Sequence, residues 1–235
     1  MKKTILSSIM SLLFVASAFA TNSGGNSVYI DQTNSDYTSV SITQTGSGNQ
    51  VGDRTNLITP AFVIDGNSML LTINQDGMNN TIIGNFIGGD STASVTQTGS
   101  GNTFKLNQGN FGTNGGTMNV TKTGDNNMVE FNMGTSHITN NYQYTLAIAG
   151  NLNNVLSNMN SKYIENNISI LGNSNNVTTN QIGAHGSPTF AGHKITANII
   201  GDSNAVSITQ NGTTTPNIIT LNVTGSSTTT TITQH

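Results

Sequence analysis

Residues 91–108, STASVTQTGSGNTFKLNQ, read as two short strands joined by a tight turn. Alternate side chains of a strand share a face, so this segment places aliphatic and amide side chains on one face and polar ones on the other. The turn residues Thr98, Gly99, Ser100 and Gly101 include two glycines that can adopt positive φ angles. The mixed face comprises Ser91, Ala93, Val95, Gln97, Asn102, Phe104, Leu106 and Gln108. One hairpin cannot bury that face alone, so the segment predicts further copies that stack on it.

The same frame recurs along the chain when segments are aligned on a turn Gly and on the Asn three residues later. The turn glycines are Gly46, Gly77, Gly99, Gly124, Gly150, Gly172, Gly201 and Gly225. The matching asparagines are Asn49, Asn80, Asn102, Asn127, Asn153, Asn175 and Asn204, and the eighth copy has Thr228 instead. These copies in phase predict an all-β protein, a β-solenoid in which strand-turn-strand repeats form a cross-β stack of about eight rungs.

Glutamines recur at two further positions of the frame, before the turn and six residues after the Asn position. They are Gln44, Gln75, Gln97, Gln108, Gln181, Gln210 and Gln234. A buried amide is costly unless it is paired, and a column of identical amides pairs each one with the copies above and below. The pattern therefore predicts amide ladders that support self-assembly. Lys122 takes one Gln position, and we expect it to lie at a strand end with its amine in solvent.

The motif Ser91-x5-Gln97-x-Gly99-x-Gly101-Asn102-x-Phe104-x3-Gln108 resembles the repeat of the curlins, the subunits of curli-type bacterial amyloid fibres. Phe104 stands where that family usually has a small residue. Gln44-Thr-Gly46-Ser-Gly48-Asn49 repeats the central part, Asn204-x-Val206-x3-Gln210 the closing part, and Asn26-x-Val28-x-Ile30-x-Gln32 a half repeat.

This resemblance implies a secreted, extracellular, cell-surface-associated protein. Its expected function is to form or nucleate curli-like amyloid fibres for biofilm matrix, adhesion and cell aggregation. The implied partners are other copies of the chain or a related curlin, together with an outer-membrane secretion channel and its accessory factors. It implies no cofactor, no small-molecule substrate and no requirement for nucleic acid.

The chain is expected to have three parts. Residues 1–20 have a basic start, an apolar run and the small-x-small sequence of Ala18, Phe19 and Ala20, so they predict a cleaved signal peptide. The apolar run is too short for the alternative, an uncleaved anchor. Residues 21–37 form a polar segment with the half repeat, and residues 38–235 form the solenoid. Breaks in the frame at about 53–67 and 182–193, each with a proline, predict two insertions that loop out between rungs.

Composition limits the function classes. The chain contains no cysteine, so an exported form relies neither on disulfides nor on thiolate metal sites. Only 7% of residues are charged and the formal net charge is -3, which does little to oppose association. The chain lacks a basic tract, and with it the electrostatic signature of nucleic-acid binding. Disorder of the free monomer stays open, although β-branched residues in phase with the turns favour an ordered final state.

Three acidic residues, Asp76, Asp125 and Asp202, lie beside turns. One interpretation is ordinary turn chemistry, for which Asp is well suited. The other is that they are gatekeepers, whose mutual repulsion slows premature stacking.

The sequence favours three other function classes less. An enzyme is not indicated, because the four histidines are scattered and His185 and His193, which share an insertion, have no acidic or Cys partner to hold a metal. A monomeric β-solenoid that binds ice needs a Thr-x-Thr row in every rung, whereas Thr clusters mainly at the C-terminal end. A monomeric surface-binding protein or adhesin would bind through the two insertions.

Overall fold

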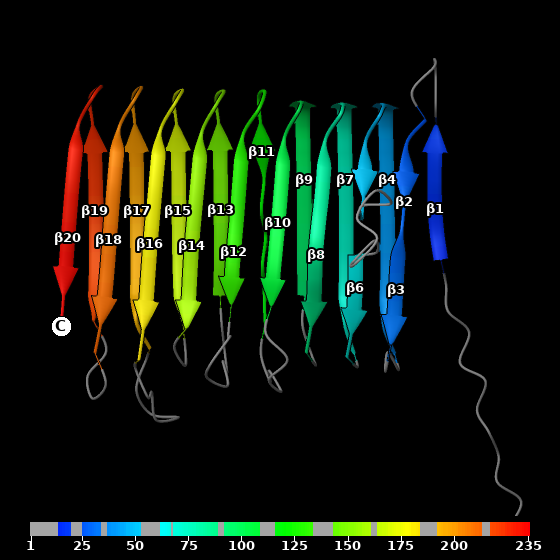
Figure 1. The fold of residues 1–235 in the computed structure, drawn as a ribbon, viewed down its shortest axis with the longest axis horizontal. Coiled ribbons are helices and arrows are strands. Elements are labelled where there is room, and N and C mark those ends of the chain that lie inside the picture. Colours follow the sequence, from blue (N-terminus) through cyan, green and yellow to red (C-terminus); the bar gives the residue numbers. More distant parts are fainter. Residues whose placement is uncertain are drawn as a thin grey trace, which may run out of the picture.

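The computed structural model describes residues 14–19, 25–33, 37–52, 62–66, 68–88, 92–108, 116–133, 143–160, 164–183, 192–212 and 217–235. Within these ranges the chain forms twenty β-strands and no helix, which confirms the expected all-β class. The strands pair in parallel and stack along one axis, with β1 at one end and β20 at the other (Figure 1). The architecture is the predicted β-solenoid-like stack of repeats.

Two sheets make up the stack, and each Gly turn carries the chain from the first sheet to the second. The first sheet contains β1 (Phe14–Phe19), β4 (Ser39–Ser47), β7 (Leu70–Met78), β9 (Thr92–Ser100), β11 (Lys122–Thr123), β13 (Gln143–Ala149), β15 (Glu165–Leu171), β17 (Lys194–Ile200) and β19 (Ile218–Thr224). The second contains β2 (Ser27–Val28), β5 (Gln50–Val51), β8 (Thr81–Ile87), β10 (Thr103–Gln108), β12 (Met128–Met133), β14 (Asn154–Asn160), β16 (Asn176–Ile182), β18 (Ala205–Asn211) and β20 (Thr229–Gln234), with β3 (Ile30–Thr33) and β6 (Phe62–Asp65) beside them.

Equivalent residues of successive repeats are hydrogen-bonded neighbours, so the sequence alignment is also the register of the sheets. Gln44 pairs with Gln75 and Gln75 with Gln97 in the first sheet. In the second sheet Val155 pairs with Val177, which pairs with Val206. The eight repeats therefore form eight rungs, each with one strand in each sheet.

The core lies between the two sheets, where the inward side chains of most rungs are buried and those of β20 in the last rung are partly exposed. The strands alternate buried and partly exposed positions, as in β14 and β18. Aliphatic side chains fill most of the inward positions, and an aromatic group occupies the middle of the stack. There, the ring of Phe131 lies 5.3 Å from Phe104 and 3.9 Å from Tyr144 between centroids. Stacked apolar side chains supply the burial that a single hairpin lacks.

The N-terminal half repeat forms the second-sheet strands β2 and β3, which pair with β5 and β6. The first-sheet position of that rung is occupied by β1, which pairs with β4 over six residues. Residues 14–19 belong to the predicted signal peptide, so the full-length chain has a ninth rung that includes them.

Both predicted insertions are shorter in the structure than the sequence indicated. The insertion expected at about 53–67 does not loop out over its whole length, because Phe62–Asp65 is strand β6, inserted between β3 and β8. Phe62 and Ile64 are buried in the core, where they continue the inward parity of the first rung. Pro60 indicated that the entire segment was unsuited to a sheet; of this segment, residues 53–61 and Asn67 lie outside the described part. The second insertion is also shorter at both ends, since Ile182 belongs to β16 and His193 is buried; residues 184–191 lie outside the described ranges.

Candidate functional site

The asparagines after the turns form one continuous inward column, which is the best-defined polar feature of the structure. In each rung the Asn Oδ1 accepts the backbone N–H of the Asn in the next rung, at 3.0–3.1 Å from Asn26 through Asn204. Its Nδ2 donates to the carbonyl oxygen of the next turn Gly, as Asn102 does to Gly124 at 2.7 Å and Asn153 to Gly172 at 2.8 Å. The column ends at Thr228, whose N–H donates to Asn204 Oδ1 at 2.9 Å.

The turn glycines form a second column that depends on the first. Gly99 and Gly124 have φ angles of 109° and 117°, a region that L-residues rarely adopt. A Cβ atom on Gly124 would lie 2.1 Å from the carbonyl oxygen of Gly150, the same oxygen that accepts Asn127 Nδ2 at 2.7 Å. Glycine is therefore required both by the backbone conformation and by the close approach of the next rung.

A third ladder runs along the outside of the turns and includes two of the three candidate gatekeepers. Asp125 Oδ1 accepts the backbone N–H of Ser100 at 2.7 Å, and Asp202 Oδ1 accepts that of Asn173 at 2.6 Å. Asn151 makes the same contact with the N–H of Asp125 at 2.7 Å. Asp76 differs, because it lies on β7 one residue before the turn Gly and is exposed. Asp125 and Asp202 therefore have a structural partner that fits the turn-chemistry interpretation.

The glutamines fall into two separate columns. Gln44, Gln75 and Gln97 are buried in the first sheet near the turns, and Gln181 and Gln210 are buried in the second sheet at the other end of the strands. Amide-to-amide bonds join Gln44 Nε2 to Gln75 Oε1 at 2.8 Å and Gln181 Nε2 to Gln210 Oε1 at 3.1 Å. Gln234 continues the second column in register with Gln210. Gln108 pairs with Met133 in the sheet.

The expectation for Lys122 is wrong, since its side chain is fully buried. Its Nζ donates to the carbonyl oxygen of Thr103 at 2.7 Å and lies 5.9 Å from the ring centroid of Phe104. Gln97 Nε2 makes the equivalent contact with Thr81 O at 3.4 Å, so Lys122 replaces the donor of a glutamine at this position. Burial lowers the pKa of Lys122 well below its ordinary value. The sequence offered no counter-ion from which this burial could be inferred.

A small buried polar network was missed by the sequence analysis. Asn166 Nδ2 donates to Ser157 Oγ at 2.8 Å and to Thr179 Oγ1 at 3.3 Å, and the two hydroxyls lie 2.7 Å apart. All three residues have the inward parity of their strands. Polar residues at expected core positions were the available signal, and their mutual pairing explains why the core accepts them.

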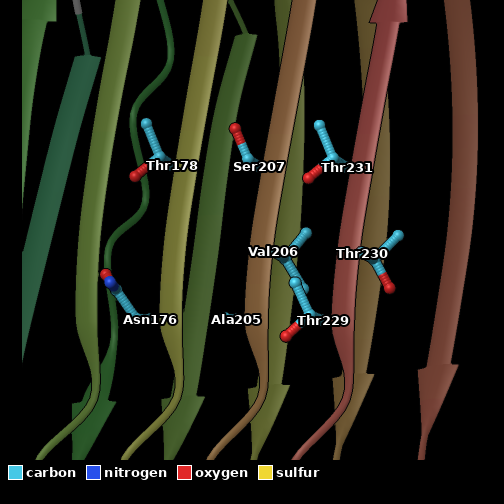
Figure 2. Close-up of a pocket in the computed structure, with 8 residues that line it drawn as sticks. All are labelled: Asn176, Thr178, Ala205, Val206, Ser207, Thr229, Thr230 and Thr231. Carbon is cyan, nitrogen blue, oxygen red and sulfur yellow. The ribbon is translucent and has the colours of Figure 1, made fainter.

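The outer surface offers one shallow hollow of about 140 Å³ near the C-terminal end (Figure 2). It lies over Ala205, whose small side chain leaves space between Asn176 and Thr229 on the neighbouring strands. The remaining lining residues are Thr178, Val206, Ser207, Thr230 and Thr231. Its lining is neutral and open to solvent, so it does not resemble an enclosed ligand pocket.

The histidines do not converge on a metal site in the described part of the chain. His193 is buried and His235 is exposed, while His137 and His185 lie outside the described ranges. Across the residues that the structure describes, three or more His, Cys, Asp or Glu side chains are never grouped as metal ligands. A helix long and apolar enough to cross a membrane is likewise absent from those residues.

Comparison with known proteins gives no independent identification. No family model, curated protein or solved structure matches this chain. The repeat residues and the geometry of the columns are therefore the basis for a functional proposal.

Proposed function

We propose that this chain is a secreted structural protein that self-assembles into, or nucleates, extracellular curli-like amyloid fibres for biofilm matrix, adhesion and cell aggregation. The observation that carries the proposal is the Asn column, in which every rung accepts and donates hydrogen bonds identically from Asn26 to Asn204. A stack whose rungs are interchangeable can be extended by the rungs of another molecule. Extension then needs neither a cofactor nor an energy source.

The two ends of the stack support addition of a second copy. The outer edges of the terminal strands carry backbone groups without a neighbouring strand in the described structure, which makes them templates for pairing. Gln32 at one end and Gln234 at the other occupy the same second-sheet position, and each has a buried amide oxygen without a hydrogen-bond partner among the described residues. Stacking one copy on the next would bring these amides together, as Gln181 and Gln210 already are within the chain.

Export is expected to expose one of these ends. Strand β1 covers the edge of β4 in the full-length chain, and it lies within the predicted signal peptide. Ala18 is in β1, and Ala20 lies just outside the described residues. Cleavage after Ala20 would remove β1 and leave β2 and β3 as a half rung whose first-sheet position is empty. The partners implied by the curlin resemblance are another copy or a related subunit, with an outer-membrane channel for secretion.

A second candidate function is a monomeric β-solenoid that binds a surface or acts as an adhesin. The composition of the last rung favours it, because Thr228 replaces the column Asn and Thr229, Thr231 and Thr233 are exposed. Monomeric solenoids need a polar terminal rung, and these threonines would provide one. An ice-binding version is less favoured.

The test is fibre formation by the purified mature chain, beginning at residue 21, after dilution from denaturant. Thioflavin-T fluorescence should show a lag that preformed seeds abolish, and electron microscopy should show unbranched fibres. A very short unseeded lag would favour a nucleating role. A soluble β-rich monomer that never forms fibres would overturn the proposal in favour of the monomeric solenoid.

Disulfide trapping tests the stacking register, since the chain has no native cysteine. In stacked copies Val28 would lie over Thr230, because Val28 pairs with Val51 and Thr230 with Val206 in the same core column. Neighbouring strands are about 4.8 Å apart, which permits a disulfide. The double variant Val28→Cys/Thr230→Cys should give a ladder of covalent oligomers in oxidised fibres. Val28→Cys/Thr231→Cys is the matched control, because residue 231 has the opposite parity.

A further inference from the structure

His193 holds a fixed proton in the interior of the stack. Its ring lies immediately before β17 and is fully buried. The backbone N–H of Asn217 points at Nδ1 over 3.1 Å, and the carbonyl oxygen of Ile182 lies 3.2 Å from Nε2. A backbone N–H can only donate and a carbonyl can only accept. Nδ1 must therefore be unprotonated and Nε2 must carry the hydrogen, which fixes one neutral tautomer.

These two bonds join three successive rungs. Ile182 ends β16, His193 precedes β17, and Asn217 is the residue directly before β19. Two further hydrogen bonds close the same corner, since the backbone N–H of Lys194 donates to Asn217 O at 2.9 Å and the side-chain Nε2 of Gln210 donates to that oxygen at 2.8 Å. Asn217 thus ties the C-terminal rung to the stack at the end opposite the Gly turns, in addition to the β17–β19 and β18–β20 ladders.

Among the described residues, no unpaired acidic group is available as a counter-charge for a protonated ring. Glu165 on β15 and Lys194 on β17 are the charged groups of the strands around it, and they form an ion pair with each other at the surface, with side chains 42% and 44% exposed. Strands β16, β18 and β19 contain no titratable residue. Burial accordingly lowers the pKa of His193 below its ordinary 6.5, and the carbonyl groups of Ile182 and Gly212 oppose this only in part.

We propose that His193 is a proton-sensitive latch that holds the C-terminal rung, β19 with β20, on the stack. A proton on Nδ1 makes that nitrogen a donor facing the backbone N–H of Asn217, and the hydrogen bond between them is lost. The latch is closed above about pH 6.5, where the unfolded and folded rings are both neutral. Below that pH His193 binds a proton more readily when the C-terminal rung is released than when it is attached, so the attachment of β19 weakens as pH falls.

The consequence for assembly rests on the proposed function. The C-terminal rung is the face that one copy would present to the N-terminal end of the next. Mild acid would therefore withhold that face from stacking while leaving earlier rungs ordered.

Hydrogen exchange read by mass spectrometry tests the latch on the mature chain, as monomer or dissolved from fibres. Labelling times are corrected for the intrinsic effect of pH. Between pH 7.5 and 5.5 the protection of amides in β19 should fall by up to about tenfold, while that of β13 stays constant. His193→Asn is the comparison, because its Oδ1 still accepts from Asn217 but does not titrate. An equal loss of β19 protection in this variant, or no loss in the wild type, would overturn the latch.

A second measurement covers the case in which His193→Asn does not fold. In a chain labelled with ¹⁵N-histidine, His193 should show the Nε2–H tautomer at pH 7 and titrate below the ordinary value of 6.5. A ring that titrates near 6.5 as an ordinary tautomer mixture would contradict the latch. Seeded growth at both pH values then separates the two ideas. Failure to form fibres at either pH, with exchange as expected, would reject the proposed function and retain the latch.

Discussion

The Asn column and the first-sheet Gln column run side by side through the same rungs, yet they behave differently. Each column Asn bonds the backbone of the next rung through both of its amide atoms, as Asn153 does with Gly172 and Asn175. The Gln column is intermittent: Gln97 Oε1 has no partner among the described residues, and Lys122, Ile148, Ile170 and Ile199 take the position in later rungs. The backbone of the next rung therefore requires Asn at every turn, whereas the Gln position accepts Gln, Lys or Ile.

The largest expected effect comes from adjacent residues that share an identity but not an environment. Asn153→Ala should lower the free energy of unfolding by about 2–6 kcal/mol, because it leaves the partly buried Gly172 O and the buried N–H of Asn175 unpaired, each costing about 1–3 kcal/mol. Asn154→Ala should cost less than about 0.5 kcal/mol, since Asn154 faces outward. Urea denaturation followed by circular dichroism measures both. Equal costs would show that the column is not what holds the rungs together.

The next effect separates the turn conformation from the contact between rungs. Gly124→Ala and Gly225→Ala both place a side chain at a positive φ, 117° and 132°, which costs about 1–3 kcal/mol. Only at Gly124 does the new Cβ meet the next rung, 2.1 Å from Gly150 O, whereas at Gly225 the nearest atom is 3.7 Å away. Gly124→Ala should therefore cost about 1–3 kcal/mol more. Thermal unfolding of the two variants gives the difference, and its absence would mean that strain alone explains the glycine.

A smaller effect, of opposite sign, is expected at the cation in the Gln column. Lys122→Gln should stabilise the chain at pH 7 by about 1–3 kcal/mol, because an amide keeps a donor for Thr103 O without a buried ammonium group. The folded pKa of Lys122 is lowered, so the unfolded state binds more protons below the ordinary value of 10.5, and wild-type stability should rise with pH towards it. The variant should lack this rise between pH 7 and 10. A destabilised variant with unchanged pH dependence would reject the assignment.

Lys122 is also a residue whose burial could not be predicted from the sequence. The rung frame and its register followed from the spacing of Gly and Asn, because both residues are required by backbone geometry at every turn. No comparable sequence signal predicted a buried charged residue. Lys122 lies at a glutamine position and is buried without an opposite charge among the described residues. Strand β6 was missed for a related reason, since its inward residues Phe62 and Ile64 match the period only after the intervening residues 53–61 are removed.

The position of Gln97 offers the converse test of the Gln column. Gln97→Ile places at this site the residue that Ile148, Ile170 and Ile199 already provide in later rungs. It removes an amide whose Oε1 is unpaired and whose Nε2 contact is 3.4 Å, so the change in unfolding free energy should stay within about 1 kcal/mol. Urea denaturation of Gln97→Ile and Asn153→Ala under the same conditions compares their costs in unfolding free energy. A cost as large as that of the asparagine would make the two columns equivalent.

The smallest effect on stability is expected at the acidic residues beside the turns. Asn151 and Asn173 occupy the same turn position as Asp125 and Asp202. Each of these side chains accepts the equivalent backbone N–H of the preceding rung. Replacing both aspartates and Asp76 by Asn should therefore leave the unfolding free energy within about 0.5 kcal/mol.

Since the fold is unaffected, the lag of thioflavin-T fluorescence in the same triple variant reports charge alone. The three changes remove negative charge from a chain whose net charge is only -3. An unchanged lag would assign the aspartates to turn geometry, as the outer ladder indicates. Repulsion between copies would instead be shown by a lag that is several-fold shorter in the variant than in the wild type, together with a wild-type lag that is longer at low salt than at high salt. The salt comparison is informative because surface charges are screened within about 10 Å at 0.1 M salt. Asp76 alone, which lies outside the ladder, should then account for a disproportionate share of the change.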